Sequence, residues 1–330
     1  MLHQGSFKEI KIKTALLANG WASDVSIKID NAGDIVDIQT GVQDASSGCL
    51  IAGLANCHSH AHQRAMAGLA ETASSNNDSF WTWRKTMYQF IDTMQPHQLR
   101  AIAAQLYLEM LTAGYTHVAE FQYLHHQRNG QHYNDIAEMS LQTLCAAQEV
   151  GMGITSLPVH YQYAGFGGQK ITDQQARFFN TPDSLLKIVD SLKTASNNNQ
   201  NANVGIAGHS LRATSKERFS EVLNGLMSSD TPVHMHIAEQ VKEVEDCLEW
   251  SGSRPMDYCL DNFDVDSNWC LIHATHMSES ETLRLAQSGA VAGLCPSTEA
   301  NLGDGFFNAT SYLAANGKLA IGSDSHISTS

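Results

Sequence analysis

The chain has 330 residues, of which 42% are hydrophobic and 16% are charged, so it is globular and large enough for one α/β barrel or two ordinary domains. Its formal net charge of −14 offers no basic surface to nucleic acid or to an anionic membrane. No apolar run approaches the roughly 20 residues of a membrane span. Seven cysteines without a CxxC pair indicate reduced thiols, and we expect a cytoplasmic protein.

The first 50 residues predict a small β-domain. Residues 10–13 and 25–29 alternate apolar and polar side chains, and residues 31–34 predict a turn before a third strand at 35–38. We therefore expect a β-sandwich-like domain at residues 1–50 and a larger domain at residues 51–330.

In the larger domain, strands alternate with helices or with gaps long enough for a helix. A first apolar strand leads into His58, and a long irregular segment follows at residues 61–96. The capping-box pattern from Thr214 to Glu217 predicts the start of one helix. Further apolar strands are expected at residues 116–121, 153–159, 204–207, 232–237, 269–273, 290–294 and 318–321.

Eight such strands predict an α/β fold, a (β/α)8 barrel of the TIM type. The alternative is a doubly wound open sheet, which typically begins with a glycine-rich turn such as GxGxxG. Here the first strand ends in HxHxH instead, which favours the barrel.

Ionisable side chains recur at the ends of the predicted strands, where a barrel of this kind places its functional residues. A single buried histidine is commonly a structural residue, but five of the eight strands end in this way, which indicates a metal site. The residues concerned are His58 and His60, His209 and Arg212, His234, His236 and Glu239, His273, and Asp324.

The pair His58 and His60 supplies half of such a site, because side chains at i and i+2 lie on one face of a strand. A histidine of the fifth strand and Asp324 would complete a set of three nitrogens and one oxygen, with a position left for water, as in catalytic zinc sites. Zinc can lower the pKa of its water to about 7. Glu239 suits a general acid and base, and His273 could orient the hydroxide.

These residues together resemble the amidohydrolase superfamily, in particular its deaminases that use one metal ion. Binuclear members place a carboxylated lysine on strand four, and residues 204–210 contain no lysine, so one divalent ion, expected to be Zn²⁺, is favoured. The spacing to Glu239 and the resemblance favour His236 over His234. The implied metal ligands are His58, His60, His236 and Asp324.

A longer block, HSHAHQRAMAGLAE from residue 58 together with FWTWR at residues 80–84, resembles the formiminoglutamate deiminase family. This resemblance runs from about residue 50 to the end of the sequence, and His62 departs from it, because the family more often has an aromatic residue there. It implies hydrolysis of N-formimino-L-glutamate to N-formyl-L-glutamate and ammonia in histidine degradation.

The resemblance also implies roles for individual residues. The catalytic residues would be Glu239, His273 and Asp324. The residues that hold the substrate would be Gln63, Arg84, Tyr123, His209 and Arg212. Two arginines suit a dicarboxylate amidine because a guanidinium group binds carboxylates in a bidentate manner. Arg84 and Arg212 could instead be surface charges.

Other interpretations of the sequence remain open. Another amidine or nucleobase deaminase would have stacking aromatic residues in place of paired arginines, and an inactive metal-binding fragment is a further alternative. We expect a homodimer that acts on a small molecule.

Because the sequence ends at Ser330, directly beyond strand eight, we also expect a truncated chain without the barrel's eighth helix, with exposed apolar surface on the order of several hundred Å². Such a chain would have poor solubility and reduced activity.

Overall fold

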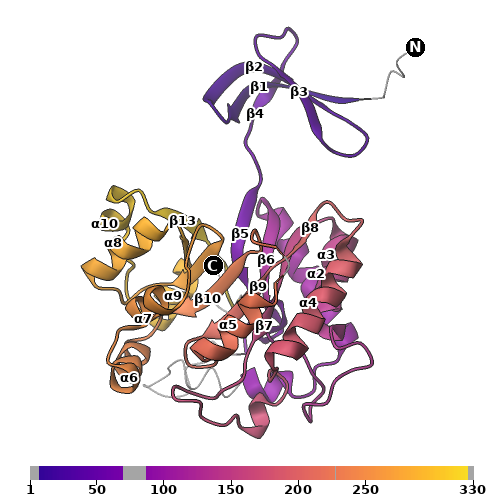
Figure 1. Cartoon of the computed structure of the whole chain (residues 1–330). Coiled ribbons are helices and arrows are strands. Elements are labelled where there is room, and N and C mark those ends of the chain that lie inside the picture. The colour runs from indigo at the N-terminus through magenta and orange to yellow at the C-terminus, as the bar shows by residue number, and fades with distance from the viewer. Residues whose placement is uncertain (1–6, 70–86, 227, 326–330) are drawn as a thin grey trace. The chain divides into compact units, whose positions relative to one another are not determined.

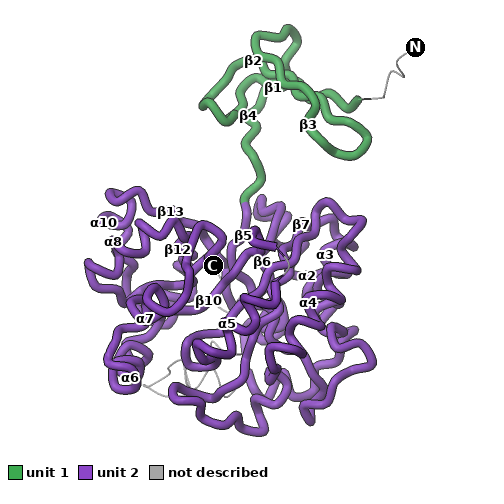
Figure 2. The backbone as a smooth tube through the Cα atoms, viewed as in Figure 1, with its two compact units in different colours: residues 1–54 green, residues 55–330 purple. Residues whose placement is uncertain are grey.

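A computed structural model describes residues 7–69, 87–226 and 228–325 of the chain (Figure 1). The chain divides into two compact units, residues 1–54 and residues 55–330 (Figure 2). Within the described residues, every helix is too short or too polar to cross a membrane.

The first unit is a four-stranded sheet in the order β3-β2-β1-β4. Its strands are β1 (Lys8–Leu17), β2 (Gly20–Ile29), β3 (Ile35–Gln39) and β4 (Ser46–Leu50). β2 pairs antiparallel with β1 and β3, whereas β4 runs parallel to β1. The predicted turn after β2 is present, because Asp30 accepts the backbone N–H groups of Ala32 and Asp34 at 2.9 and 3.0 Å. Ala15, Val25 and Ile27 form the small buried core.

The second unit is the predicted (β/α)8 barrel, which is confirmed. Its eight strands follow the order β13-β12-β11-β10-β9-β7-β6-β5, and a parallel bridge between Ser59 and Asp324 joins the two ends of this sheet. The strands are β5 (Leu54–Ser59), β6 (Tyr115–Gln122), β7 (Gly153–His160), β9 (Ile206–Ser210), β10 (Val233–Ile237), β11 (Trp269–His273), β12 (Val291–Leu294) and β13 (Lys318–Ile321).

Helices cover the outside of these strands (Figure 1). They are α2 (Pro96–Thr112), α3 (Glu138–Val150), α4 (Pro182–Ser196), α5 (Lys216–Asn224), α6 (Val241–Ser251), α7 (Pro255–Asn262), α8 (Glu279–Ser288), α9 (Pro296–Leu302) and α10 (Ala309–Ala314), with the 3₁₀ helices η1 (Ala61–Met66) and η2 (Asp173–Gln175). The core between helices and strands contains side chains from both layers, such as Leu106 of α2, Leu185 of α4 and Leu271 of β11. Apolar faces repeated at helical spacing therefore pack these helices against the strands.

Two local predictions differ from the structure. The expected strand at 204–207 is divided, because Val204 ends β8 (Ala202–Val204), which pairs with β7, and the barrel strand β9 begins at Ile206. Gly205 lies between them, where a Cβ would be only 2.5 Å from the carbonyl oxygen of Pro232, so only glycine fits.

The helix start predicted at Thr214 is also wrong by one residue. Ser215 is the N-cap of α5, and its hydroxyl accepts the Arg218 backbone N–H at 3.3 Å. The Thr214 hydroxyl lies 2.5 Å from His160 Nδ1 and is therefore engaged elsewhere. The side-chain partner of Thr214 is remote in sequence, so the local pattern could not reveal it.

Candidate active site

Four side chains from three strand ends meet inside the barrel. The ligand atoms of His58, His60, His236 and Asp324 all lie within 4.8 Å of one another, and all four residues are buried. His58 Nε2 is 3.1 Å from His60 Nε2 and 2.9 Å from His236 Nε2. Asp324 Oδ1 lies 3.4 Å from His58 Nε2 and 3.3 Å from His60 Nε2. His234, the other candidate of β10, is buried but does not belong to this group.

The second nitrogens of the rings decide which atoms face the centre. His60 Nδ1 lies 3.0 Å from the carbonyl oxygen of Phe121, and His236 Nδ1 lies 2.9 Å from that of His209. A carbonyl only accepts, so each Nδ1 carries the proton and donates, which leaves a lone pair on each Nε2. Burial lowers the pKa of His58 to about 3, with His60 as a further cause, so this ring is neutral as well.

Lone pairs of neutral imidazoles and a carboxylate oxygen that converge in a buried space would repel one another without a cation. Three nitrogens and one oxygen are the donors that a divalent ion of the zinc type prefers, and backbone carbonyls that hold the second ring nitrogens are typical of metal sites. The four residues therefore fit a metal ion, and we call His58, His60, His236 and Asp324 the metal group.

The backbone at the strand ends turns sharply around this group. Ala238, His273, Ala274 and Asp324 have φ values of 50°, 69°, 50° and 58°, which non-glycine residues rarely adopt. Such conformations cost on the order of 1–3 kcal/mol each and concentrate at functional sites. Here they direct the side chains of His273, at the end of β11, and Asp324, after β13, toward one another past the intervening strand β12.

Glu239 and His273 lie beside the metal group. Glu239 Oε2 is 3.9 Å from His273 Nε2, and Glu299 Oε1 is 3.3 Å from His273 Nδ1. Burial alone would lower the pKa of His273, but the carboxylates of Glu239, Glu299 and Asp324 outweigh it and raise this pKa to about 10. The two side chains thus lie close enough to take part in proton transfer at one place.

The structure brings three of the five predicted substrate residues to the same side of the metal group. Gln63 Nε2 donates to the Tyr123 hydroxyl at 2.6 Å. The Tyr123 ring lies 5.2 Å from the His60 ring and 5.6 Å from the His209 ring, measured between centroids. These three residues lie close enough to the metal ligands to contact a substrate bound there. Their role in substrate binding stays a prediction.

Of the two predicted arginines, only Arg212 lies among the described residues. Arg212 Nη2 lies 4.0 Å from Glu243 Oε2, and Glu243 also accepts the backbone N–H groups of Ala238 and Glu239 at 3.1 and 3.3 Å. Arg212 therefore lies beside the glutamate that supports the loop carrying Glu239, without a close ion pair to it. Arg84 lies outside the described residues.

Sequence analysis missed a carboxylate that contacts the end of β5, the strand that leads to His58 and His60. Glu120 of β6 is fully buried and accepts from the Ser59 hydroxyl at 2.8 Å, the Ala61 backbone N–H at 2.7 Å and the Tyr107 hydroxyl at 3.1 Å. Burial raises the pKa of Glu120 to about 7. A glutamate inside an apolar strand was the signal that could have revealed it, because a buried carboxylate needs partners.

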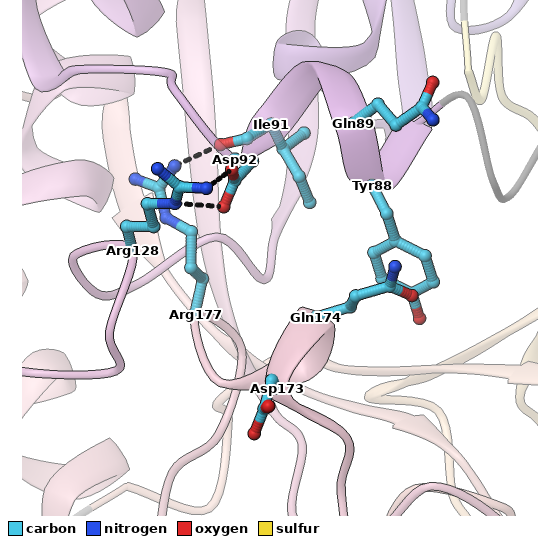
Figure 3. A pocket seen from close by; sticks show the side chains of 8 residues that line it. All are labelled: Tyr88, Gln89, Ile91, Asp92, Arg128, Asp173, Gln174 and Arg177. Carbon is cyan, nitrogen blue, oxygen red and sulfur yellow. Dashed lines mark hydrogen bonds and ion pairs between the residues drawn. The ribbon is translucent and has the colours of Figure 1, made fainter.

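A pocket of about 350 Å³ lies elsewhere in the second unit and is shown in Figure 3. It is lined by Tyr88, Gln89, Ile91, Asp92, Arg128, Asp173, Gln174 and Arg177. The predicted site residues are not among them. Its two arginines are both engaged, Arg128 with Asp92 and Arg177 with backbone carbonyl groups.

Two family models match the chain. The amidohydrolase family matches residues 49–330, and the N-terminal domain of formimidoylglutamate deiminase HutF matches residues 9–47. Together they cover both units of the structure.

Individual relatives agree with these matches. A formimidoylglutamate deiminase of Pseudomonas aeruginosa is 49% identical over 320 residues, which are 96% of this chain and 70% of that protein. A 5-methylthioadenosine/S-adenosylhomocysteine deaminase of Halobacterium salinarum is 25% identical over 92% of this chain and 65% of that protein. The crystal structure of an amidohydrolase from Brucella melitensis has 49% identity and a TM-score of 0.93, over 97% of this chain and 71% of that chain. By these matches, the chain belongs to the amidohydrolase family.

Proposed function

We propose that this chain is a metal-dependent deiminase that hydrolyses N-formimino-L-glutamate to N-formyl-L-glutamate and ammonia in histidine degradation. The observation that carries the proposal is the buried group of His58, His60, His236 and Asp324, with Glu239 and His273 beside it. The identity of 49% to a formimidoylglutamate deiminase, together with the match to the N-terminal domain of such enzymes, favours this substrate.

The metal is proposed to be one Zn²⁺ ion. His58, His60, His236 and Asp324 would hold it, because histidine nitrogens and carboxylate oxygens are donors that bind zinc. A zinc ion held there would act as a Lewis acid and lower the pKa of a water ligand to about 7.

The chain's own residues supply the proton transfers. Glu239, buried and 3.9 Å from His273, would take a proton from the attacking water and deliver it to the nitrogen that leaves. His273 would donate a hydrogen bond to the attacking oxygen, and Asp324 would accept one from it. Water adds to the formimino carbon and gives a tetrahedral intermediate. The hydroxyl proton of this intermediate would then pass through Asp324 to the same nitrogen, and the C–N bond breaks as the C=O bond forms, which releases ammonia and leaves the formyl group.

Recognition of the substrate is proposed to rest on Gln63, Tyr123, His209, Arg212 and Arg84. Arg212 supports this, because its Nε is buried without a hydrogen-bond partner among the described residues and Glu243 lies only at 4.0 Å. A guanidinium in this state gains from a carboxylate ligand, because the ligand would satisfy the buried donor.

We also infer a cytoplasmic location. The seven cysteines all lie in the described part of the chain and are unpaired there, which is the usual state of thiols in a reducing compartment.

An assay of ammonia release tests the function directly. The purified chain, loaded with Zn²⁺, is expected to release ammonia from N-formimino-L-glutamate and not from 5-methylthioadenosine. Glu239→Gln should retain the metal and lose at least about 100-fold in kcat, the usual share of a general acid and base. Deamination of the nucleoside alone would contradict the proposed substrate.

A further inference from the structure

Helix α9 follows β12, and the helix and the residues directly after it place two carboxylates next to the active site. Glu299 lies within the helix, and its Oε1 accepts the backbone N–H of Cys295 at 2.8 Å at the helix start. Asp304 follows the Gly303 cap, and its backbone N–H donates to the Glu299 carbonyl at 2.9 Å. Both side chains are more than nine-tenths buried. One short segment therefore fixes the positions of both carboxylates.

Glu299 contacts the ring of His273 on the side away from Glu239. The distances are 3.3 Å from Glu299 Oε1 to His273 Nδ1 and 3.9 Å from Glu239 Oε2 to His273 Nε2. A carboxylate on Nδ1 fixes the rotation of an imidazole ring and therefore the direction of its Nε2.

Asp304 reaches Glu239 through one amide group. Gln240 Nε2 donates to Asp304 Oδ1 in a close contact and also lies 3.5 Å from Glu239 Oε1. Asp304 Oδ2 is buried and has no hydrogen-bond partner among the described residues. A buried carboxylate that is only half satisfied carries a cost, so packing alone does not account for it.

We propose that α9 and Asp304 are the positioning element for the proton-transfer pair: Glu299 orients the His273 imidazole, and Asp304, acting through the Gln240 amide, orients the Glu239 carboxylate. The inference rests on the proposed function for the roles of His273 and Glu239. Glu299 and Asp304 are positioning residues, because each acts through another side chain.

Steady-state kinetics of the Zn²⁺-loaded chain test both halves. Glu299→Gln and Asp304→Asn keep the size of each side chain and remove its charge. Each is expected to lower kcat by about 10- to 100-fold, the usual effect of a group behind an active-site residue. KM should change less than about threefold and metal content should not change, because neither residue touches substrate or metal in this scheme. Parent-like kcat in either variant overturns the proposal.

A matched control separates positioning from stability. Glu281 of α8 is also a fully buried carboxylate, and it pairs with Arg254 at 2.6 Å. Glu281→Gln is expected to lower the melting temperature and leave the kcat of the folded, metal-loaded fraction unchanged. Should Glu299→Gln fail to fold, Glu299→Asp keeps the charge but withdraws it from His273, and it should show the same selective loss of kcat. An equal loss of kcat in the control would overturn the proposal.

A double variant tests the route through Gln240. If Asp304 acts only through this amide, Gln240→Ala combined with Asp304→Asn should lower kcat no more than the more damaging single change. Effects that multiply would overturn this half of the proposal.

Nitrogen-15 NMR of histidine rings gives a readout that does not depend on the substrate. The Nδ1 resonance of His273, identified by its loss in His273→Gln, is expected to shift in Glu299→Gln and to stay in place in Glu281→Gln. An unchanged resonance overturns the inference. An inactive parent that still shows the shift would contradict the proposed function alone.

Discussion

His234 and His236 lie two residues apart on β10, and only the ring of His236 joins the metal group. His236→Gln is expected to lower metal content well below the one ion per chain expected of the parent after dialysis, because a ligand is lost. His234→Gln should retain the ion. Elemental analysis of both variants, purified alike, makes the comparison, and equal metal contents would contradict the assignment.

Arg212 carries the prediction on specificity. Arg212→Ala is expected to lower kcat/KM for N-formimino-L-glutamate. The fall should correspond to a loss of roughly 2–5 kcal/mol of transition-state stabilisation, the cost of truncating one partner of a buried charged pair. Metal content should be unchanged. Arg218→Ala is the control, because Arg218 is exposed and pairs with Glu221 on the surface of α5. If both variants matched the parent, Arg212 would not contact the substrate.

Glu120 makes stability depend on pH. Burial raises the pKa of Glu120 from 4.5 to about 7. Between pH 4.5 and pH 7, the Glu120 carboxyl group therefore keeps its proton in the folded chain and loses it in the unfolded chain. The contribution to the free energy of unfolding is therefore complete below pH 4.5 and is lost as the pH rises through 7. Its size is on the order of 3 kcal/mol, at about 1.4 kcal/mol for each unit of pKa.

Glu120→Gln is neutral at every pH and should remove this component. Urea unfolding at pH 5 and pH 8, at equal metal loading, is expected to show a smaller difference between the two conditions in the variant than in the parent. The same difference in both proteins would mean that Glu120 ionises normally in the folded chain.

At the scale of elements, Arg177 connects the loop after β7 to the segment that precedes α2. Its guanidinium donates to the carbonyl oxygens of His126 and Met94 at 2.8 Å and, in a close contact, to that of Ile91, which Figure 3 shows beside the pocket. Burial lowers the pKa of Arg177, yet three backbone acceptors hold the charge in place.

Arg177→Met leaves these carbonyl groups without a donor. It is expected to lower the free energy of unfolding by at least about 3 kcal/mol, since each buried acceptor without a partner costs about 1–3 kcal/mol. Arg128→Met is the matched control, because Arg128 lines the same pocket and is 73% exposed in its ion pair with Asp92. Its loss should cost less than about 1 kcal/mol. Chemical denaturation of both variants measures the difference, and similar losses would remove this role from Arg177.

The sequence predicted the barrel strands and the residues at their ends well, for a physical reason. Buried parallel strands are short apolar runs whose carboxyl ends meet on one face, so the strand ends alone predict that His58, a histidine of β10 and Asp324 lie in one group. The choice of His236 over His234 also needed the spacing to Glu239 and the family resemblance. Contacts between elements could not be predicted in this way. The bonds of Glu120 to Ser59 and of Glu299 to His273 join different strands and helices, and nothing local in the sequence indicates them.

At the scale of the whole molecule, each unit has its own core, and the metal group belongs to the second unit alone. Folding of the second unit is therefore the condition for metal binding. The homodimer stays a prediction, and light scattering of the purified chain would test it.

The bridge between Ser59 and Asp324 has a consequence for how the chain folds. The hydrogen bond from Asn56 to Ser323 next to this bridge joins residues 267 positions apart, so contact between the first and last strands of the barrel closes a loop that contains nearly all of the second unit. Contacts this remote are slow to form, because the entropy of closing so long a loop is lost before any contact compensates for it. Ligands from both strands exist together only at that stage. Uptake of the metal during refolding should consequently coincide with the slowest phase. A bound ion would also slow the separation of the first and last strands during unfolding.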